Sequence, residues 1–62
     1  MTQKELLYVE DAISHEANII SYLEESVSKV SDYNVQEFFE KELNYHNKIK
    51  KDLLNFLKEL SK

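Results

Sequence analysis

The chain of 62 residues contains no cysteine, glycine, proline or tryptophan. Without cysteine it forms neither disulfides nor thiolate metal sites. Without glycine and proline it lacks the residues that most often end helices and build tight turns between strands. Glu, Lys and Leu, which favour helix, are abundant instead. Small domains of this size usually need a metal or a partner chain when disulfides are missing, so a helical protein that binds one of these is expected.

The balance of charge argues against nucleic acid as a partner. Twelve acidic residues outnumber eight basic residues, giving a net charge of −4, whereas phosphate binding needs a basic face. No run of 18 apolar residues is present, so we expect no membrane span. The opening residues do not combine a basic segment with an apolar one, so we expect no secretion signal.

The first helix is predicted over residues 3–30. Thr2 and Glu5 form a capping box, in which each side chain accepts a hydrogen bond from the other residue's backbone N–H. The residues that follow at alternating spacings of three and four are apolar with one exception, Glu16. This first seam consists of Leu6, Val9, Ile13, Glu16, Ile20, Leu23, Val27 and Val30.

A turn over residues 31–33 and a second helix over residues 34–60 are predicted next. Ser31, Asp32 and Asn34 are residues that favour turns and helix caps. Asp32 and Asn34 are both suitable caps for the second helix, and Asn34 has Glu37 three residues later. The second seam again has spacings of four and three and holds two polar residues. It consists of Val35, Phe39, Glu42, His46, Ile49, Leu53, Phe56 and Leu60.

The fold class predicted for residues 1–62 is all-α, a single antiparallel helical hairpin. A turn of a few residues forces the two helices to lie side by side. Apolar residues also flank both seams, so each helix has an apolar stripe wider than one helix contact requires. These flanking residues are Ala12, Ala17, Ile19, Phe38, Leu43, Tyr45 and Leu57. We therefore expect a homodimer or higher homo-oligomer, which forms a four-helix bundle of the ferritin-like type.

Three polar seam residues, Glu16, Glu42 and His46, are the candidate metal ligands. Pairing the helices about the turn places Glu16 level with His46, and Glu42 one turn nearer the loop. Di-iron and di-manganese bundles use one Glu on each of two helices and a Glu-x-x-His pair on each of the other two. A homodimer has this inventory, but Glu42 and His46 are four residues apart rather than three.

The alternative interpretation of these three residues is a buried polar layer. A Glu–His contact inside a helical core fixes the register and the number of chains at some cost in stability. Neither a catalytic Ser-His-Asp set nor a glycine-rich phosphate loop is present, so no enzyme is predicted. Under this interpretation there is no cofactor; under the first, the cofactor is iron or another divalent metal.

The chain also resembles a known family in two segments. These are Lys4-Glu5-Leu6-Leu7-Tyr8-Val9-Glu10-Asp11 and the stretch from Glu16 through Tyr22-Leu23, Ser31-Asp32 and Val35 to Glu42-Leu43-Asn44-Tyr45-His46. Together they resemble the ferritin-like hairpin of the spore coat protein F-type family of spore-forming Firmicutes. In that family an early Glu, a Ser-Asn-Pro type of turn and a Leu-Asn-Glu-Glu-His run occur at comparable separations.

The chain departs from the family pattern at several positions. Asn44-Tyr45-His46 stands where the family has Glu-Glu-His, and Tyr33 replaces the proline of the turn. His46 occupies the level at which ferritin-like sites have a Glu, and Ile49 follows where the His is expected. The ligand set of any metal-binding ancestor is therefore partly lost.

Three functions follow as hypotheses. The resemblance implies a non-enzymatic structural protein associated with the spore coat or with sporulation, located in the cytoplasm or the spore. The polar seam residues support a minimal ferritin-like dimer that binds iron. The wide apolar stripe also fits a helical adaptor that binds a different protein.

Overall fold

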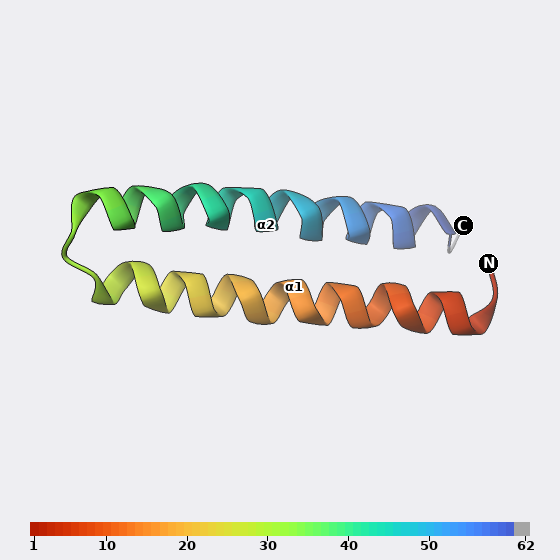
Figure 1. Ribbon diagram of the computed structural model, residues 1–62. Helices are drawn as coiled ribbons and strands as arrows, with labels where there is room; N and C mark the ends of the chain where they lie inside the picture. Colours follow the sequence, from red (N-terminus) through yellow and green to blue (C-terminus); the bar gives the residue numbers. More distant parts are fainter. Residues whose placement is uncertain (61–62) are drawn as a thin grey trace.

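A computed structural model of the protein describes residues 1–60. This part of the chain forms two helices and no strand: α1 spans Gln3–Lys29 and α2 spans Tyr33–Leu60. The helices run antiparallel, side by side along their length, with the loop at one end and the start of α1 beside the end of α2 at the other (Figure 1). The predicted all-α helical hairpin is confirmed.

The capping box predicted at the start of α1 is present. The backbone N–H of Glu5 donates to the Thr2 hydroxyl at 3.1 Å, and the backbone N–H of Thr2 donates to Glu5 Oε1 at 3.1 Å. These bonds satisfy two backbone donors that the helix itself leaves unpaired. The hydrogen bonds from Thr2 hold the pKa of the exposed Glu5 carboxyl below its ordinary value, because they favour its charged form. The contribution of this cap is therefore present at neutral pH and is lost as acid protonates Glu5.

The loop covers residues 30–32 rather than the predicted 31–33, so α1 ends and α2 begins one residue earlier than predicted. Val30 adopts an extended backbone, so α1 ends at Lys29 rather than at residue 30. Asp32 caps α2, because Asp32 Oδ1 accepts from the backbone N–H of Val35 at 3.1 Å. Of the two caps that the sequence left open, Asp32 is the one used, and α2 accordingly begins at Tyr33 rather than at residue 34.

A side chain from α2 closes the loop over the end of α1. The Gln36 amide nitrogen donates to the Val30 backbone carbonyl at 2.6 Å. This carbonyl is one of the acceptors that the last turn of a helix leaves without an internal partner. The bond ties the two helices together at the loop, where no glycine is available to end α1 in the usual left-handed cap.

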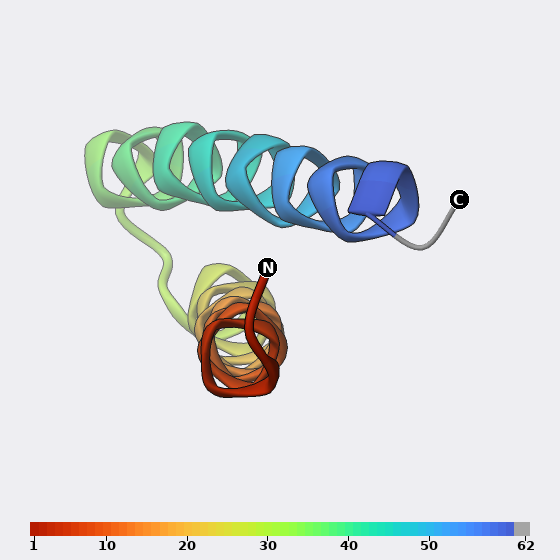
Figure 2. The ribbon, with the colours of Figure 1, turned by 90° about the vertical axis from the view of Figure 1, so that its right-hand side faces the viewer.

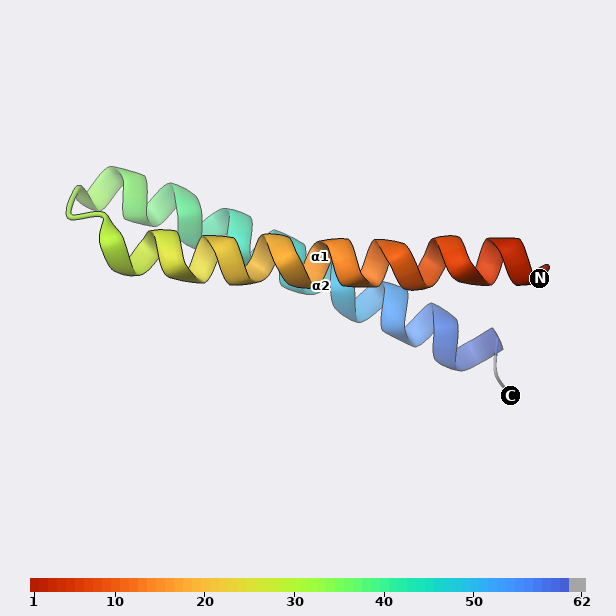
Figure 3. The ribbon, with the colours of Figure 1, turned by 90° about the horizontal axis from the view of Figure 1, so that it is seen from below.

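The helices cross at an angle near the middle of their length, as the views from the end and from below show (Figure 2, Figure 3). The hairpin is long and narrow, with extents of 45 × 15 × 11 Å, because it consists of two helices only. Only Ile20 and Leu23 of the described residues are buried, each with 8% of its surface exposed. The remaining seam residues are at best half-buried, because a single neighbouring helix covers one side of each.

The end of the second seam differs from its predicted pattern. Leu57 is half-buried, whereas Phe56 and Leu60 are exposed. Because the helices diverge away from their crossing point, the residue nearest to α1 in the last turns of α2 is Leu57 and not Phe56. An open pocket of about 400 Å³ is left between the helix ends, lined by Met1, Thr2, Gln3, Leu6, Leu57 and Leu60.

We predict that Asp32→Ala lowers the free energy of unfolding by about 1 kcal/mol, since the first turn of α2 loses its side-chain cap. Urea titration at a fixed chain concentration measures this change. Asn34→Ala is the matched control and should change the free energy by less than about 0.5 kcal/mol. A larger loss for Asn34→Ala than for Asp32→Ala would contradict the assignment of the cap.

Candidate functional site

Glu16 and His46 meet across the two helices, as the sequence predicted. His46 Nδ1 lies 2.6 Å from Glu16 Oε2, which joins a side chain of α1 to one of α2. A carboxylate only accepts hydrogen bonds, so with Glu16 ionised the imidazole carries a hydrogen on Nδ1 and donates it. The side chains of Glu16 and His46 keep 14% and 19% of their surface exposed.

Glu42 completes the group from the same helix as His46. Its carboxylate oxygen Oε2 lies 3.7 Å from His46 Nε2, one helical turn away, and its side chain is 40% exposed. This distance is too long for a hydrogen bond and short enough for electrostatic attraction when the imidazole is protonated. The two nitrogens of His46 therefore face two different carboxylates, one on each helix.

The group lies at the middle of both helices. Glu16 lies 13 residues from each end of α1, and His46 lies within one residue of the middle of α2. The helices cross near this level (Figure 3). Because the axes approach one another most closely where they cross, short polar side chains such as Glu and His can span the gap there. Tyr45 packs its ring edge-to-face on His46, with centroids 5.4 Å apart.

The arrangement bears on metal binding in one specific way. Histidines that bind metals commonly donate their second ring N–H to a carboxylate, which fixes the orientation of the ring. Glu16 is placed to do this through Nδ1, leaving Nε2 and the Glu42 carboxylate side by side. Among residues 1–60, however, no group of three His, Asp or Glu side chains is arranged to hold a metal ion. One hairpin therefore supplies part of a metal site at most.

The other histidine and the tyrosines lie away from this group or at its edge. His15 is exposed. The four tyrosines, Tyr8, Tyr22, Tyr33 and Tyr45, are all exposed as well. No helix in the part of the chain that the structure describes is long and apolar enough to cross a membrane.

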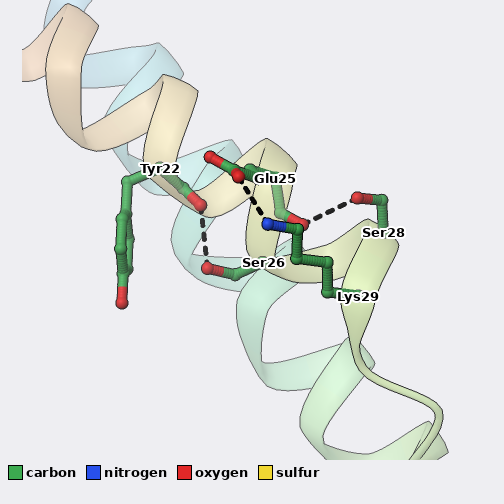
Figure 4. Close-up of polar contacts among 5 residues, drawn as sticks. All are labelled: Tyr22, Glu25, Ser26, Ser28 and Lys29. Carbon is green, nitrogen blue, oxygen red and sulfur yellow. Dashed lines mark hydrogen bonds and ion pairs between the residues drawn. The ribbon is translucent and has the colours of Figure 1, made fainter.

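The ion pair between Glu25 and Lys29 is an exposed standard against which the half-buried Glu16–His46 contact can be compared. Lys29 Nζ lies 2.6 Å from Glu25 Oε1 on the outer surface of α1, and both side chains are mostly exposed (Figure 4). In the same region Ser26 donates to the Tyr22 carbonyl at 2.8 Å and Ser28 donates to the Glu25 carbonyl at 2.7 Å. The Glu25–Lys29 pair has the same distance as Glu16–His46 but far more water around it, so it should contribute much less to stability.

We predict that the double variant Glu16→Leu/His46→Leu is more stable than either single variant. Each single change leaves one half-buried polar group without its partner, whereas the double change fills the seam with apolar side chains. The coupling energy from a double-mutant cycle should be about 1–2 kcal/mol, measured by urea unfolding at one chain concentration.

The control is the same cycle on Glu25→Ala and Lys29→Ala. It should give a coupling energy of about 0.5 kcal/mol or less, since exposed pairs within one helix contribute little. If the two cycles gave equal coupling energies, the contact between Glu16 and His46 would have no special role in holding the helices together.

Comparison of the chain with protein-family models, with curated proteins and with solved structures gives no match. The resemblance to the spore coat protein F-type hairpin therefore stays a prediction from the residues quoted for it. What the chain does has to be inferred from its own surface and from the group formed by Glu16, Glu42 and His46.

Proposed function

We propose that the protein is a non-enzymatic structural component that works as a self-associated four-helix bundle of the ferritin-like type. The observation that carries this proposal is the large surface of the single hairpin. It exposes 4998 Å², whereas a compact monomer of 7.4 kDa exposes about 4,200 Å². The excess of about 800 Å² equals what one partner contributes to an interface of standard size.

The same scaling relation gives the area that a dimer would cover. A compact protein of twice this mass exposes about 7,000 Å², so two hairpins would bury about 3,000 Å² in total when they pair. This value lies in the range of permanent homodimers, about 2,000–5,000 Å². The exposed surface is also of the right kind, because it includes large apolar side chains on both helices. Examples are Leu7 and Tyr8 on α1, and Phe38, Tyr45, Leu54 and Phe56 on α2.

The resemblance to the spore coat protein F-type family supports a role in the spore coat or in sporulation. Such a role requires assembly and no chemistry, and the polar residues of the seams, Glu16, Glu42 and His46, contact one another in a single group. In this proposal Glu16 and His46 set the register of the bundle, since a shift of either helix would separate them.

A second candidate function is binding of iron or another divalent metal at the centre of the dimer. The contact between His46 Nδ1 and Glu16, with Nε2 facing Glu42, is the observation that favours it. A two-fold axis would supply a second copy of Glu16, Glu42 and His46, and the four carboxylates of the pair would then need positive charge nearby. A metal bound there would supply positive charge and, if it were iron, redox chemistry.

We predict that the protein has the mass of a dimer or larger at micromolar concentration. The physical reason is the uncovered apolar surface, which costs about 25 cal/mol for each Å² left in water. Light scattering or sedimentation equilibrium measures the mass. A stably helical monomer under these conditions would overturn the proposed assembly and would favour the adaptor, whose apolar stripe is covered by a different protein.

Metal analysis separates the two candidate functions. Protein purified without chelator and then exposed to Fe²⁺ or Zn²⁺ should retain less than about 0.1 metal ion per chain if the polar group is structural, because no further ligand is needed to satisfy it. About 0.5 to 1 ion per chain, lost in Glu42→Gln, would instead establish the metal-binding dimer. The Glu16→Leu/His46→Leu variant is the background control.

A further inference from the structure

The exposed aromatic residues beside the seams lie on one side of the hairpin, whereas the smaller apolar residues Ala17 and Leu43 lie on the other. On α2, Phe38, Tyr45 and Phe56 immediately precede the half-buried residues Phe39, His46 and Leu57. On α1, Ala12, Ile19 and Ser26 immediately precede Ile13, Ile20 and Val27. In an antiparallel pair of helices, the residue one position before an inward-facing residue lies on the same side of the plane through the two helix axes, whichever helix it belongs to. These six residues therefore form one continuous surface, here named the paired side.

The opposite side of the hairpin is mostly polar. The positions that immediately follow seam residues carry Ser14, Ser21, Glu24 and Ser28 on α1, and Glu40, Asn47 and Lys50 on α2, with Leu7, Ala17, Leu43 and Leu54 as the apolar exceptions. The paired side is interrupted by Lys48 and Asp52, whose charges lie 3.6 Å apart and compensate each other. A partner that buries apolar surface therefore fits the paired side, with its exposed aromatic rings, better than the opposite one.

The two helices contribute side chains of different size to the paired side. α2 presents three exposed aromatic rings, at Phe38, Tyr45 and Phe56. On α1 the half-buried side chains of this side are the smaller Ala12, Ile19 and Ser26, whereas Tyr8 and Tyr22, which also precede seam residues, are exposed. Dense packing requires large side chains to face small ones. The complement to the aromatic rings of one hairpin is therefore α1 of a second hairpin.

The charges of the two helices favour the same pairing. α1 carries six acidic residues and two lysines, a charge of −4, whereas α2 carries five of each and is neutral. Placing two α1 helices side by side would bring charges of −4 and −4 together. Placing α1 against the α2 of a partner avoids this repulsion. If these two helices are also antiparallel, the N-terminal end of each helix dipole lies beside the C-terminal end of its neighbour.

We propose that two copies of the hairpin pair through the paired side, with α1 of each copy packed antiparallel on α2 of the other, so that both loops lie at the same end of the bundle. This inference rests on the proposed self-association and adds the surface, the helix pairing and the orientation. The two-fold axis runs along the bundle, and every residue of the partner stands at the level of its counterpart. The two Glu16–His46 contacts then form one layer across the middle.

The orientation is tested with one cysteine, because the chain has none of its own. Ser31→Cys in the loop is labelled with a nitroxide, and the distance between the labels of two copies is measured by pulsed electron paramagnetic resonance. Loops at the same end give about 20–30 Å, from helix spacings of about 10 Å plus the label arms. Loops at opposite ends give at least the 45 Å length of the hairpin.

This experiment distinguishes failure of the proposed helix pairing from failure of the proposed self-association. A dimer mass with a distance near 20–30 Å supports the pairing described here. A dimer mass with a distance of 45 Å or more overturns this orientation and leaves the self-association standing. A monomer mass without a distance between copies overturns both.

The surface is tested by two variants of equal charge. Tyr45→Glu puts a carboxylate on the paired side and should raise the dissociation constant of the dimer at least tenfold. Leu54→Glu puts the same charge on the opposite side of the same helix and should change the constant by less than about twofold. Equal effects of the two variants, in protein that keeps its helix content at high concentration by circular dichroism, would overturn the assignment of the paired side.

Discussion

Two helices touch along one line, and this limit governs the rest of the structure. However apolar each helix is, its neighbour covers only the residues on the facing side, so Ile20 and Leu23 alone are buried within residues 1–60. The crossing of the axes shortens the line further, because the helices separate toward their ends (Figure 3). Surface that a larger domain would cover with its own chain is therefore left for another molecule to cover.

The Glu16–His46 contact has a cost as well as a use. An apolar pair at the same level would bury more surface and need no partner atoms, so the polar pair is a poor choice if stability were the only requirement. Its value is directional: a hydrogen bond of 2.6 Å has one geometry, whereas apolar side chains slide past one another with little loss. The hairpin thus gives up some stability at its centre for a fixed alignment of its two helices.

Much of the fold follows from local chemistry that the sequence displays. The capping box of Thr2 and Glu5, the seams and the meeting of Glu16 with His46 depend on spacing alone, and spacing is what a sequence records. The choice between Asp32 and Asn34 could not be made, because both side chains accept the same hydrogen bond and the outcome depends on where the backbone turns. That Leu57 is half-buried in place of Phe56 depends on the crossing of the helices, which the spacing of residues within one helix does not report.

The candidate site was less accessible to sequence reasoning for a different reason. The sequence predicts Glu16, Glu42 and His46 on the inner faces of the helices. It does not predict which carboxylate faces which nitrogen of the His46 imidazole. The structure assigns Nδ1 to Glu16 and turns Nε2 toward Glu42, which makes Glu16 a partner of the ring. Whether further ligands approach depends on groups from outside the single hairpin, which the spacing of residues along one helix does not report.

The placement of the chain ends has a consequence for the history of such folds. The start of α1 and the end of α2 lie at the same end of the hairpin (Figure 1). In a bundle where α2 of one copy neighbours α1 of the next, a short connecting segment would join the two copies in a single polypeptide without moving any helix. Duplication and fusion of a gene for such a hairpin would then yield an up-down-up-down four-helix domain in one step. The two halves would afterwards be free to diverge, so that polar residues present twice in the dimer could be kept in one half and lost in the other.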